Sequence, residues 1–142
     1  IEMKVVYWSQ TGNTEKMANL IAQGIKEAGK EAEVVSLSDI TVDDLKNEEI
    51  IIFGNPAYGA EQLEESEVEP FVDSLEGNIE GKKVALFGSW GWGEGEWMKE
   101  LEEKIESYGA TLIAEGLTVK ELPEGEDETR CIEFGKLIAK EA

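Results

Sequence analysis

Residues 7–14 of this chain read Tyr7-Trp8-Ser9-Gln10-Thr11-Gly12-Asn13-Thr14, and this stretch decides the fold. It begins at the end of an apolar run typical of a buried strand, and a helical pattern starts near Thr14. Hydroxyl and amide side chains at such a turn favour phosphate binding, because the free N–H groups and the dipole of a helix N-terminus attract an anion. The residues that we expect to hold the phosphate are Ser9, Gln10, Thr11, Gly12, Asn13 and Thr14.

Two common phosphate-binding loops do not fit this stretch. A Walker A loop needs a lysine and a serine or threonine directly after its last glycine, whereas Asn13 follows Gly12 here. A dinucleotide-binding loop needs three spaced glycines after the first strand, and this turn has one. A polar turn that only caps the helix is the remaining alternative, since serine, threonine and asparagine are all good caps.

A glycine-rich loop with three tryptophans follows a later apolar run. It reads Gly88-Ser89-Trp90-Gly91-Trp92-Gly93-Glu94-Gly95-Glu96-Trp97. A loop rarely exposes this much aromatic surface without a use, and a planar ligand stacked on an indole would explain it. Trp92 lies between two glycines and is the candidate for stacking, whereas Trp97 begins a helical stripe and is expected to pack in the core.

Together with a third motif, these stretches resemble those of the short-chain flavodoxins of anaerobic bacteria such as clostridia. The third motif is Asn55-Pro56-Ala57-Tyr58-Gly59-Ala60-Glu61, and the resemblance covers essentially the whole chain. It implies a flavodoxin-like doubly wound α/β fold with a five-stranded parallel sheet in the order 2-1-3-4-5, and FMN as cofactor. It also implies a low-potential one-electron carrier, not an enzyme, whose flavin cycles between semiquinone and hydroquinone.

The resemblance also implies a role for each loop. The first loop binds the FMN phosphate, Trp92 stacks on one face of the flavin and Tyr58 covers the other. Glu61 accepts a hydrogen bond from the ring N3–H, and backbone groups of Gly91 and Gly93 meet the pyrimidine edge. The expected cofactor-binding residues of the two later loops are Asn55, Pro56, Ala57, Tyr58, Gly59, Glu61, Ser89, Trp90, Gly91, Trp92 and Gly93.

Gly59 is the residue that the resemblance links to redox control. Glycine allows either sign of φ at little steric cost, so the peptide after Tyr58 can flip. A carbonyl turned toward the flavin at Gly59 would accept a hydrogen bond from N5–H after one-electron reduction. Ala60 follows Gly59 and tolerates positive φ less well, so it is expected to weaken this flip.

Apolar runs of strand length recur along the chain at residues 5–8, 34–37, 50–53, 84–87 and 111–114. They are nearly continuous, which is typical of strands buried on both faces. Helical stripes lie between and after them at residues 17–28, 98–108 and 131–138, with a shorter helix candidate at 68–75. This alternation predicts a parallel sheet with right-handed crossovers, formed by residues 1–142 as a single domain.

Charge composition restricts the partners. Thirteen basic and 32 acidic side chains give a net charge of -19, so nucleic acid and anionic membranes are poor partners. The chain segment 61–80 has no base, and we expect its acidic side chains to form a face on which basic redox proteins dock. These acids are Glu61, Glu64, Glu65, Glu67, Glu69, Asp73, Glu76 and Glu80.

Other features of composition concern cofactors and location. The chain has one cysteine and no histidine, which leaves no ligand set for zinc or an iron–sulfur cluster. Cys131 lies in a helical stripe and is expected to be a buried apolar residue. No signal peptide and no long apolar run are visible, so we expect a soluble cytoplasmic monomer that binds no metal.

Two other functions are compatible with a fold of this kind. An FMN-dependent reductase or ribonucleotide-reductase activator would need room for a substrate beside the flavin and often a longer chain. A receiver domain would need aspartates after the first and third strands, where this chain has Ser9-Gln10 and Asn55-Pro56. We therefore expect the electron carrier, with the reductase or activator as the alternative.

Overall fold

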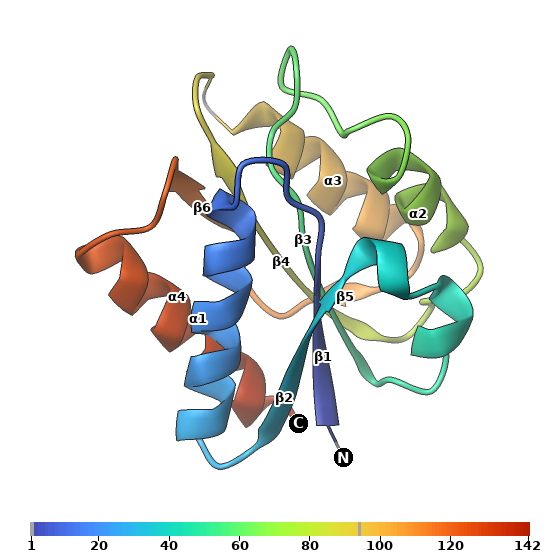
Figure 1. The fold of residues 1–142 in the computed structure, drawn as a ribbon. Helices are drawn as coiled ribbons and strands as arrows, with labels where there is room; N and C mark the ends of the chain where they lie inside the picture. The colour runs from blue at the N-terminus through green and yellow to red at the C-terminus, as the bar shows by residue number, and fades with distance from the viewer. Residues whose placement is uncertain (1, 94) are drawn as a thin grey trace.

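A computed structural model describes residues 2–93 and 95–142, and these residues form one sheet flanked by helices (Figure 1). Its strands run in parallel in the order β2-β1-β3-β4-β5, and β6 also pairs with β4. The sheet confirms the predicted order 2-1-3-4-5. The strands are β1 (Glu2–Tyr7), β2 (Glu31–Ser36), β3 (Ile50–Gly54), β4 (Lys83–Trp90), β5 (Thr111–Leu112) and β6 (Leu117–Lys120).

The fifth position of the sheet differs from the sequence-based expectation. The prediction of a single strand over residues 111–114 is wrong: β5 ends at Leu112, and β6 resumes the pairing at the far end of β4. Between them the chain turns toward α3 (Glu96–Ser107), where the Glu102 carboxylate accepts the Gly116 N–H at 2.7 Å. A Cβ at Gly116 would lie 2.5 Å from the sulfur of Met98, so any larger residue there would displace the Met98 side chain.

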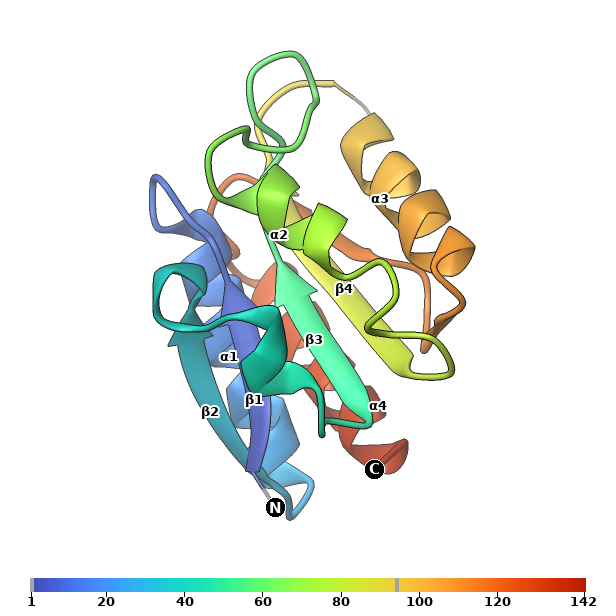
Figure 2. The same ribbon diagram turned by 90° about the vertical axis from the view of Figure 1, so that its right-hand side faces the viewer.

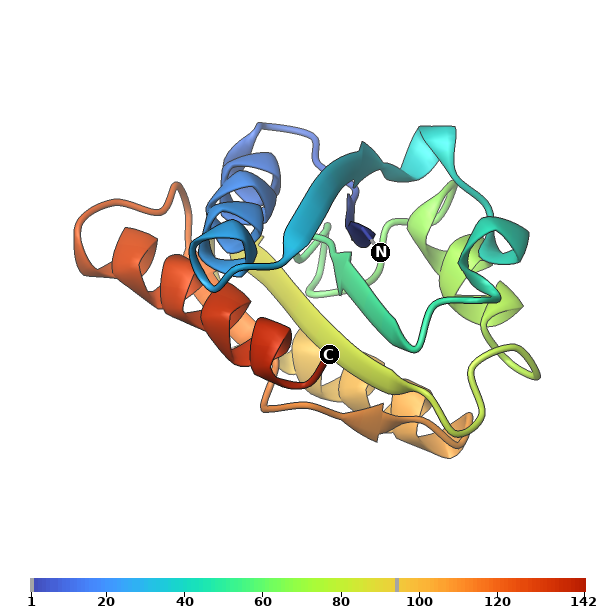
Figure 3. The ribbon, with the colours of Figure 1, turned by 90° about the horizontal axis from the view of Figure 1, so that it is seen from below.

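Two pairs of helices cover the two faces of the sheet (Figures 2 and 3). α1 (Asn13–Glu27) and α4 (Glu126–Lys140) cover one face, and α2 (Val68–Ser74) and α3 cover the other. Two short 3-10 helices, η1 (Leu37–Asp39) and η2 (Val42–Leu45), follow β2. The backbones of α1 and α4 touch at Gly24 and Gly135, where a Cβ would lie about 2 Å from a carbonyl oxygen of the facing helix.

Strand side chains alternate between the two cores. In β3, Ile50 and Ile52 pack toward α1 and α4, whereas Ile51 and Phe53 pack toward α2 and α3. Every residue of β3 is buried, which confirms the interpretation of its continuous apolar run. Cys131 is also buried, and this burial raises the pKa of its thiol to about 12.

Three loops meet at the carboxyl ends of the central strands. The loops that follow β1, β3 and β4 all lie at the top of Figure 1. In open parallel sheets ligands bind at this edge, where the strand order reverses. β1 lies between β2 and β3, so the reversal falls at the first of these loops.

No helix within residues 2–93 and 95–142 has both the length and the apolar character needed to cross a lipid bilayer.

Candidate cofactor-binding site

The three loops, together with the end of β4 and the residue after β6, line an open cavity of about 190 Å³. Most of its wall comes from residues that the sequence had singled out. The cavity is lined by Gln10, Thr11, Asn13, Pro56, Ala57, Tyr58, Ser89, Trp90, Gly91 and Glu121. The remaining predicted residues are not part of the wall of this cavity. They are Ser9, Gly12, Thr14, Asn55, Gly59, Glu61, Trp92 and Gly93. Several of these hold the lining residues in place.

The first loop leads into α1, and the N-terminus of this helix lies at the cavity, where Asn13 forms part of the wall. Gly12, the N-cap of α1, has a φ of 95°, a left-handed conformation that favours glycine. The Ser9 hydroxyl accepts a hydrogen bond from the Gly12 N–H at 3.1 Å and so closes the turn. Among the described residues no side chain caps α1. Its first N–H groups are therefore available to an anion, as the phosphate hypothesis requires.

Thr14 has a role that the sequence did not suggest. Its hydroxyl is fully buried and lies 2.9 Å from the Ser89 hydroxyl, with which it is hydrogen-bonded. The pair joins the start of α1 to the end of β4. This bond links the two elements that flank the first loop and the loop after β4.

The second loop continues the pairing with β4 beyond the end of β3. The Asn55 N–H donates to Phe87 O at 3.1 Å, and the Ala57 N–H donates to Ser89 O at 2.9 Å. Asn55 is fully buried, and neither polar atom of its side chain has a hydrogen-bond partner in the described part of the chain.

The turn that contains Gly59 is closed by an antiparallel bridge. Tyr58 and Gln62 exchange two backbone hydrogen bonds of 3.0 and 2.9 Å. Between them Gly59 has a φ of 55° and Glu61 a φ of 58°, whereas Ala60 lies outside the positive-φ region. The left-handed residues of this turn are therefore Gly59 and Glu61.

Glu61 joins the second loop to the third. Its Oε1 accepts hydrogen bonds from the backbone N–H groups of Gly95 and Glu96 at 3.0 and 2.8 Å, and so caps α3. Its Oε2 is buried and has no hydrogen-bond partner among residues 2–93 and 95–142. Gly93 has a φ of 90°, and a Cβ there would lie 2.6 Å from the Glu61 carboxyl carbon, so a side chain at this position would force Glu61 to move.

The pKa of the Glu61 carboxyl is raised. Burial is the largest cause, and the nearby Glu96 carboxyl raises the pKa further. The backbone N–H groups of Glu96 and Gly95 oppose this rise. A donor placed against Oε2 would favour the charged carboxylate.

The tryptophans differ in their surroundings. Trp92 is 65% exposed, whereas Trp97 is buried in the core beneath α3, as its helical stripe predicted. Trp90 is half-buried in the cavity wall, and the Lys120 ammonium lies 5.6 Å from the centre of its ring. Trp92 therefore has a large aromatic face free for a planar ligand.

Glu121 is the lining residue that the sequence interpretation missed. Its φ is 60° and its N–H donates to Trp90 O at 2.8 Å. Glu121 follows β6. In the sequence of this strand, the apolar residues Leu117 and Val119 alternate with polar ones, and this pattern could have revealed the strand and the loop after it.

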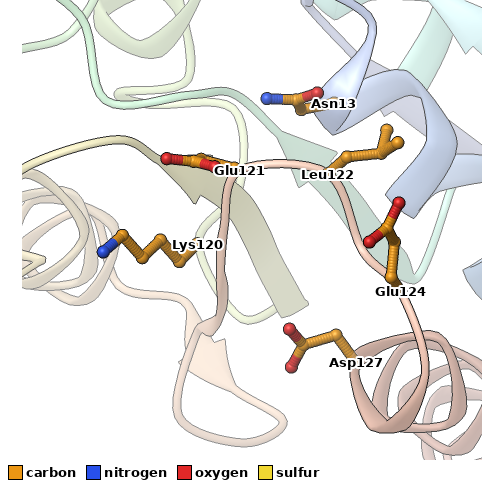
Figure 4. Close-up of a pocket in the computed structure, with 6 residues that line it drawn as sticks. All are labelled: Asn13, Lys120, Glu121, Leu122, Glu124 and Asp127. Carbon is orange, nitrogen blue, oxygen red and sulfur yellow. The ribbon is translucent and has the colours of Figure 1, made fainter.

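A wider cavity of about 660 Å³ adjoins the first and shares Asn13 and Glu121 with it (Figure 4). The other residues of its wall are Lys120, Leu122, Glu124 and Asp127. In Figure 4 Asn13 lies at the start of α1, and the remaining residues belong to the segment from the end of β6 into α4. Three acidic residues, Glu121, Glu124 and Asp127, thus share a cavity with Asn13 at the start of α1. In the part of the chain that is described, no cluster of acids could hold a metal ion.

Two of the eight acids at residues 61–80 do not belong to an acidic face. Glu61 caps α3, and Glu64 is buried and caps α2. The Glu64 carboxylate accepts hydrogen bonds from the Ser66 hydroxyl and from the N–H groups of Ser66, Glu67 and Val68. The exposed remainder, called the acidic face below, consists of Glu65, Glu67, Glu69, Asp73, Glu76 and Glu80.

The donors and acceptors present fit FMN. The uncapped N-terminus of α1 suits a phosphate, and the unpartnered Oε2 of Glu61 suits a ring N–H. The exposed indole of Trp92 suits an isoalloxazine face. These features lie on three loops that meet at one edge of the sheet.

Comparisons with known proteins agree with this chemistry. The family model described as Flavodoxin matches residues 5–135. A flavodoxin of Clostridium beijerinckii is 55% identical over 137 residues, which cover 96% of this chain and 99% of that protein. A flavodoxin of Megasphaera elsdenii is 47% identical over 138 residues, covering 97% and 98% of the two chains.

Solved structures give the same result for the fold. The solution structure of two-electron reduced Megasphaera elsdenii flavodoxin matches with a TM-score of 0.87 at 44% identity, and the match covers 99% of each chain. Oxidised flavodoxin 1 of Bacillus cereus matches with a TM-score of 0.85 at 31% identity. On the family match and these relatives, the chain belongs to the flavodoxins, which are FMN-binding electron carriers and not enzymes.

Proposed function

We propose that this chain binds one FMN between the loops that follow β1, β3 and β4 and carries electrons singly between redox proteins. The observation that carries this proposal is the meeting of these loops around one cavity, with the uncapped start of α1 beside it. Bound FMN supplies the redox chemistry, and the protein holds, orients and shields it. Residues 1–142 would act as a single FMN-binding domain.

The first loop is proposed as the phosphate site. The N–H groups at the start of α1, together with the side chains of Gln10, Thr11 and Asn13, would hold the dianion. All three residues line the cavity. Ser9 and Thr14 would act by fixing the loop, through the hydrogen bonds to Gly12 and Ser89.

The other two loops are proposed as the ring site. Trp92 and Tyr58 would cover the two faces of the flavin, and Glu61 Oε2 would accept the N3–H. The support for Glu61 is that Oε1 is already held by Gly95 and Glu96, which orients the second oxygen. Backbone groups of Gly91 and Gly93 would meet the pyrimidine edge, and Gly59 would present its carbonyl to N5.

We further propose that basic redox proteins dock on the acidic face and that the chain works as a cytoplasmic monomer. A net charge of -19 attracts basic partners and keeps two copies apart. The single free cysteine suits a reducing compartment.

Identification of the bound flavin tests the proposal. Purified protein is expected to contain one FMN per chain, which acid extraction and chromatography would release and identify. Apo-protein should bind FMN much more tightly than riboflavin, which lacks the phosphate. FAD in the extract, or equal affinities for FMN and riboflavin, would contradict the phosphate site.

A further inference from the structure

A hydrogen bond connects the acidic face to the end of the first strand. Trp8 Nε1 donates to Glu67 Oε2 at 2.8 Å. Glu67 is the N-cap of α2, and its own N–H donates to the Glu64 carboxylate at 2.8 Å. The acceptor is therefore carried by a residue whose backbone is itself fixed. The indole of Trp8 is held in one orientation as a result.

Trp8 in turn contacts Tyr58 edge to face. The ring centroids lie 6.0 Å apart, and the ring planes meet at 78°. This geometry is favourable because the positive edge of one ring meets the negative face of the other. Trp8 packs half-buried against the core on the α2 and α3 side, and only Tyr58 of this pair lines the cavity.

The main chain of Tyr58 is fixed independently, by its bridge to Gln62. That bridge does not restrict rotation about the side-chain bonds of Tyr58, whereas the contact with Trp8 does. A ring held in place before the ligand arrives loses less conformational entropy on binding.

We propose that Trp8 is a positioning residue for the cofactor: held by Glu67, its indole keeps the Tyr58 ring in place against the flavin. This inference rests on the proposed function, in which Tyr58 covers one flavin face. It also connects the acidic face to the cofactor.

Two substitutions of Glu67 separate the hydrogen bond from the charge. Glu67→Gln removes the charge but keeps an oxygen that accepts the indole N–H, whereas Glu67→Ala removes both. We expect Glu67→Ala to weaken FMN binding about fivefold relative to Glu67→Gln, the effect of roughly one hydrogen bond. The visible circular dichroism of bound FMN should change in Glu67→Ala and Trp8→Phe and remain near wild type in Glu67→Gln.

A double-mutant comparison tests the route through Tyr58. In a Tyr58→Ala background, Glu67→Ala and Glu67→Gln should bind FMN equally, because the positioned ring is gone. Urea unfolding of the apo-proteins checks that the Glu67 variants remain folded. Equal affinities and spectra of the two variants in the wild-type background would overturn the positioning role alone, as would a difference that persists without Tyr58. A wild-type protein that binds no FMN would overturn the proposed function itself.

Discussion

Single residues of this site carry separate physical tasks. Thr14 and Ser89 join the start of α1 to the end of β4 by a buried hydroxyl pair, and Glu61 joins the loop after β3 to the start of α3. Trp92 contributes exposed aromatic surface, and Gly59 contributes a backbone conformation. Substitutions at these residues should therefore produce different defects.

Trp92→Ala should weaken FMN binding and partly restore flavin fluorescence. Stacking on an indole quenches a flavin and contributes about 1 kcal/mol beyond area burial, which corresponds to a several-fold loss of affinity. Fluorescence titration of apo-protein with FMN measures both effects. Leu137→Ala, which removes another exposed apolar side chain, is the control and should leave the titration unchanged. Wild-type quenching in Trp92→Ala would mean that another residue stacks on the ring.

Gly59→Val should narrow the gap between the two one-electron midpoint potentials while FMN still binds. Gly59 has a φ of 55°, and a Cβ there would meet only open space, so the cost of a side chain is in the backbone. That cost is about 1–2 kcal/mol for a left-handed residue, and more for a β-branched one. Dithionite titration against redox dyes gives both potentials.

Gly29→Val is the matched control for this substitution. Gly29 also has a positive φ, 90°, and open space for a Cβ, but it follows α1 at the end remote from the three loops. It should lower the free energy of unfolding and leave both potentials unchanged. If the gap between the two midpoint potentials were the same in Gly59→Val as in wild type, the peptide at Gly59 would not control the potentials of the flavin.

At the scale of elements, two glutamates in the loop after β3 cap the N-termini of α2 and α3. α2 and α3 both lack a capping side chain at their own N-cap residue. Glu64 and Glu61 supply the acceptors from earlier in the chain, where the helix dipole favours a carboxylate. The loop after β3 is thus tied to both helices that cover its face of the sheet.

Glu64→Gln should reduce stability in a pH-dependent way. Burial by itself raises the pKa of Glu64, but the hydrogen bonds from Ser66, Glu67 and Val68 outweigh it and lower the pKa from 4.5 to about 2. Because the folded pKa lies below the unfolded one, the carboxylate stabilises the fold above about pH 5 and loses this effect as the pH falls toward 2.

We expect Glu64→Gln to lower the free energy of unfolding by about 1–2 kcal/mol at pH 7, typical of a lost helix cap. Urea unfolding at pH 7 and at pH 3 measures the change, and the gap from wild type should shrink at the lower pH. Glu65→Gln removes a neighbouring exposed charge and should change stability little at either pH. If Glu64→Gln lowered the free energy of unfolding by the same amount at both pH values, this would contradict the lowered pKa of Glu64.

At the scale of the whole molecule, charge sets how partners approach. The net charge is -19, and we expect the exposed acids of the acidic face to create a negative field on the side of α2. Such fields steer basic partners and raise association rates, and salt screens them with a Debye length of about 10 Å at 0.1 M.

Reversal of two charges on the acidic face should slow electron transfer to a basic acceptor. Glu69→Lys with Glu76→Lys changes the net charge by four, as does the control pair Glu31→Lys with Glu33→Lys on β2, where both side chains are exposed. Stopped-flow rates with a basic cytochrome at low salt should fall severalfold more in the first pair, and the difference should disappear at high salt. Equal rates in the two pairs would argue against docking on α2.

The sequence by itself determined the central strands, the helix positions and most of the cavity wall, and its resemblance to flavodoxins implied the strand order. The strands, helices and loops depend on local pattern: apolar runs fully buried in a parallel sheet, stripes of helical period, and turn residues at strand ends. The loops after β1, β3 and β4 then had to meet, because parallel strands bring their carboxyl ends to one edge.

Only the tertiary structure decided the rest. The segment between β5 and β6 lies against α3 at Gly116, a contact between distant segments that local pattern does not encode. The same holds for Glu121 in the cavity wall and for Trp8 beside Tyr58. Glu61 and Glu64 appeared as members of one acidic run, yet each caps a helix. Charge is visible in a sequence, whereas the N–H groups that a carboxylate meets are set by how the chain folds.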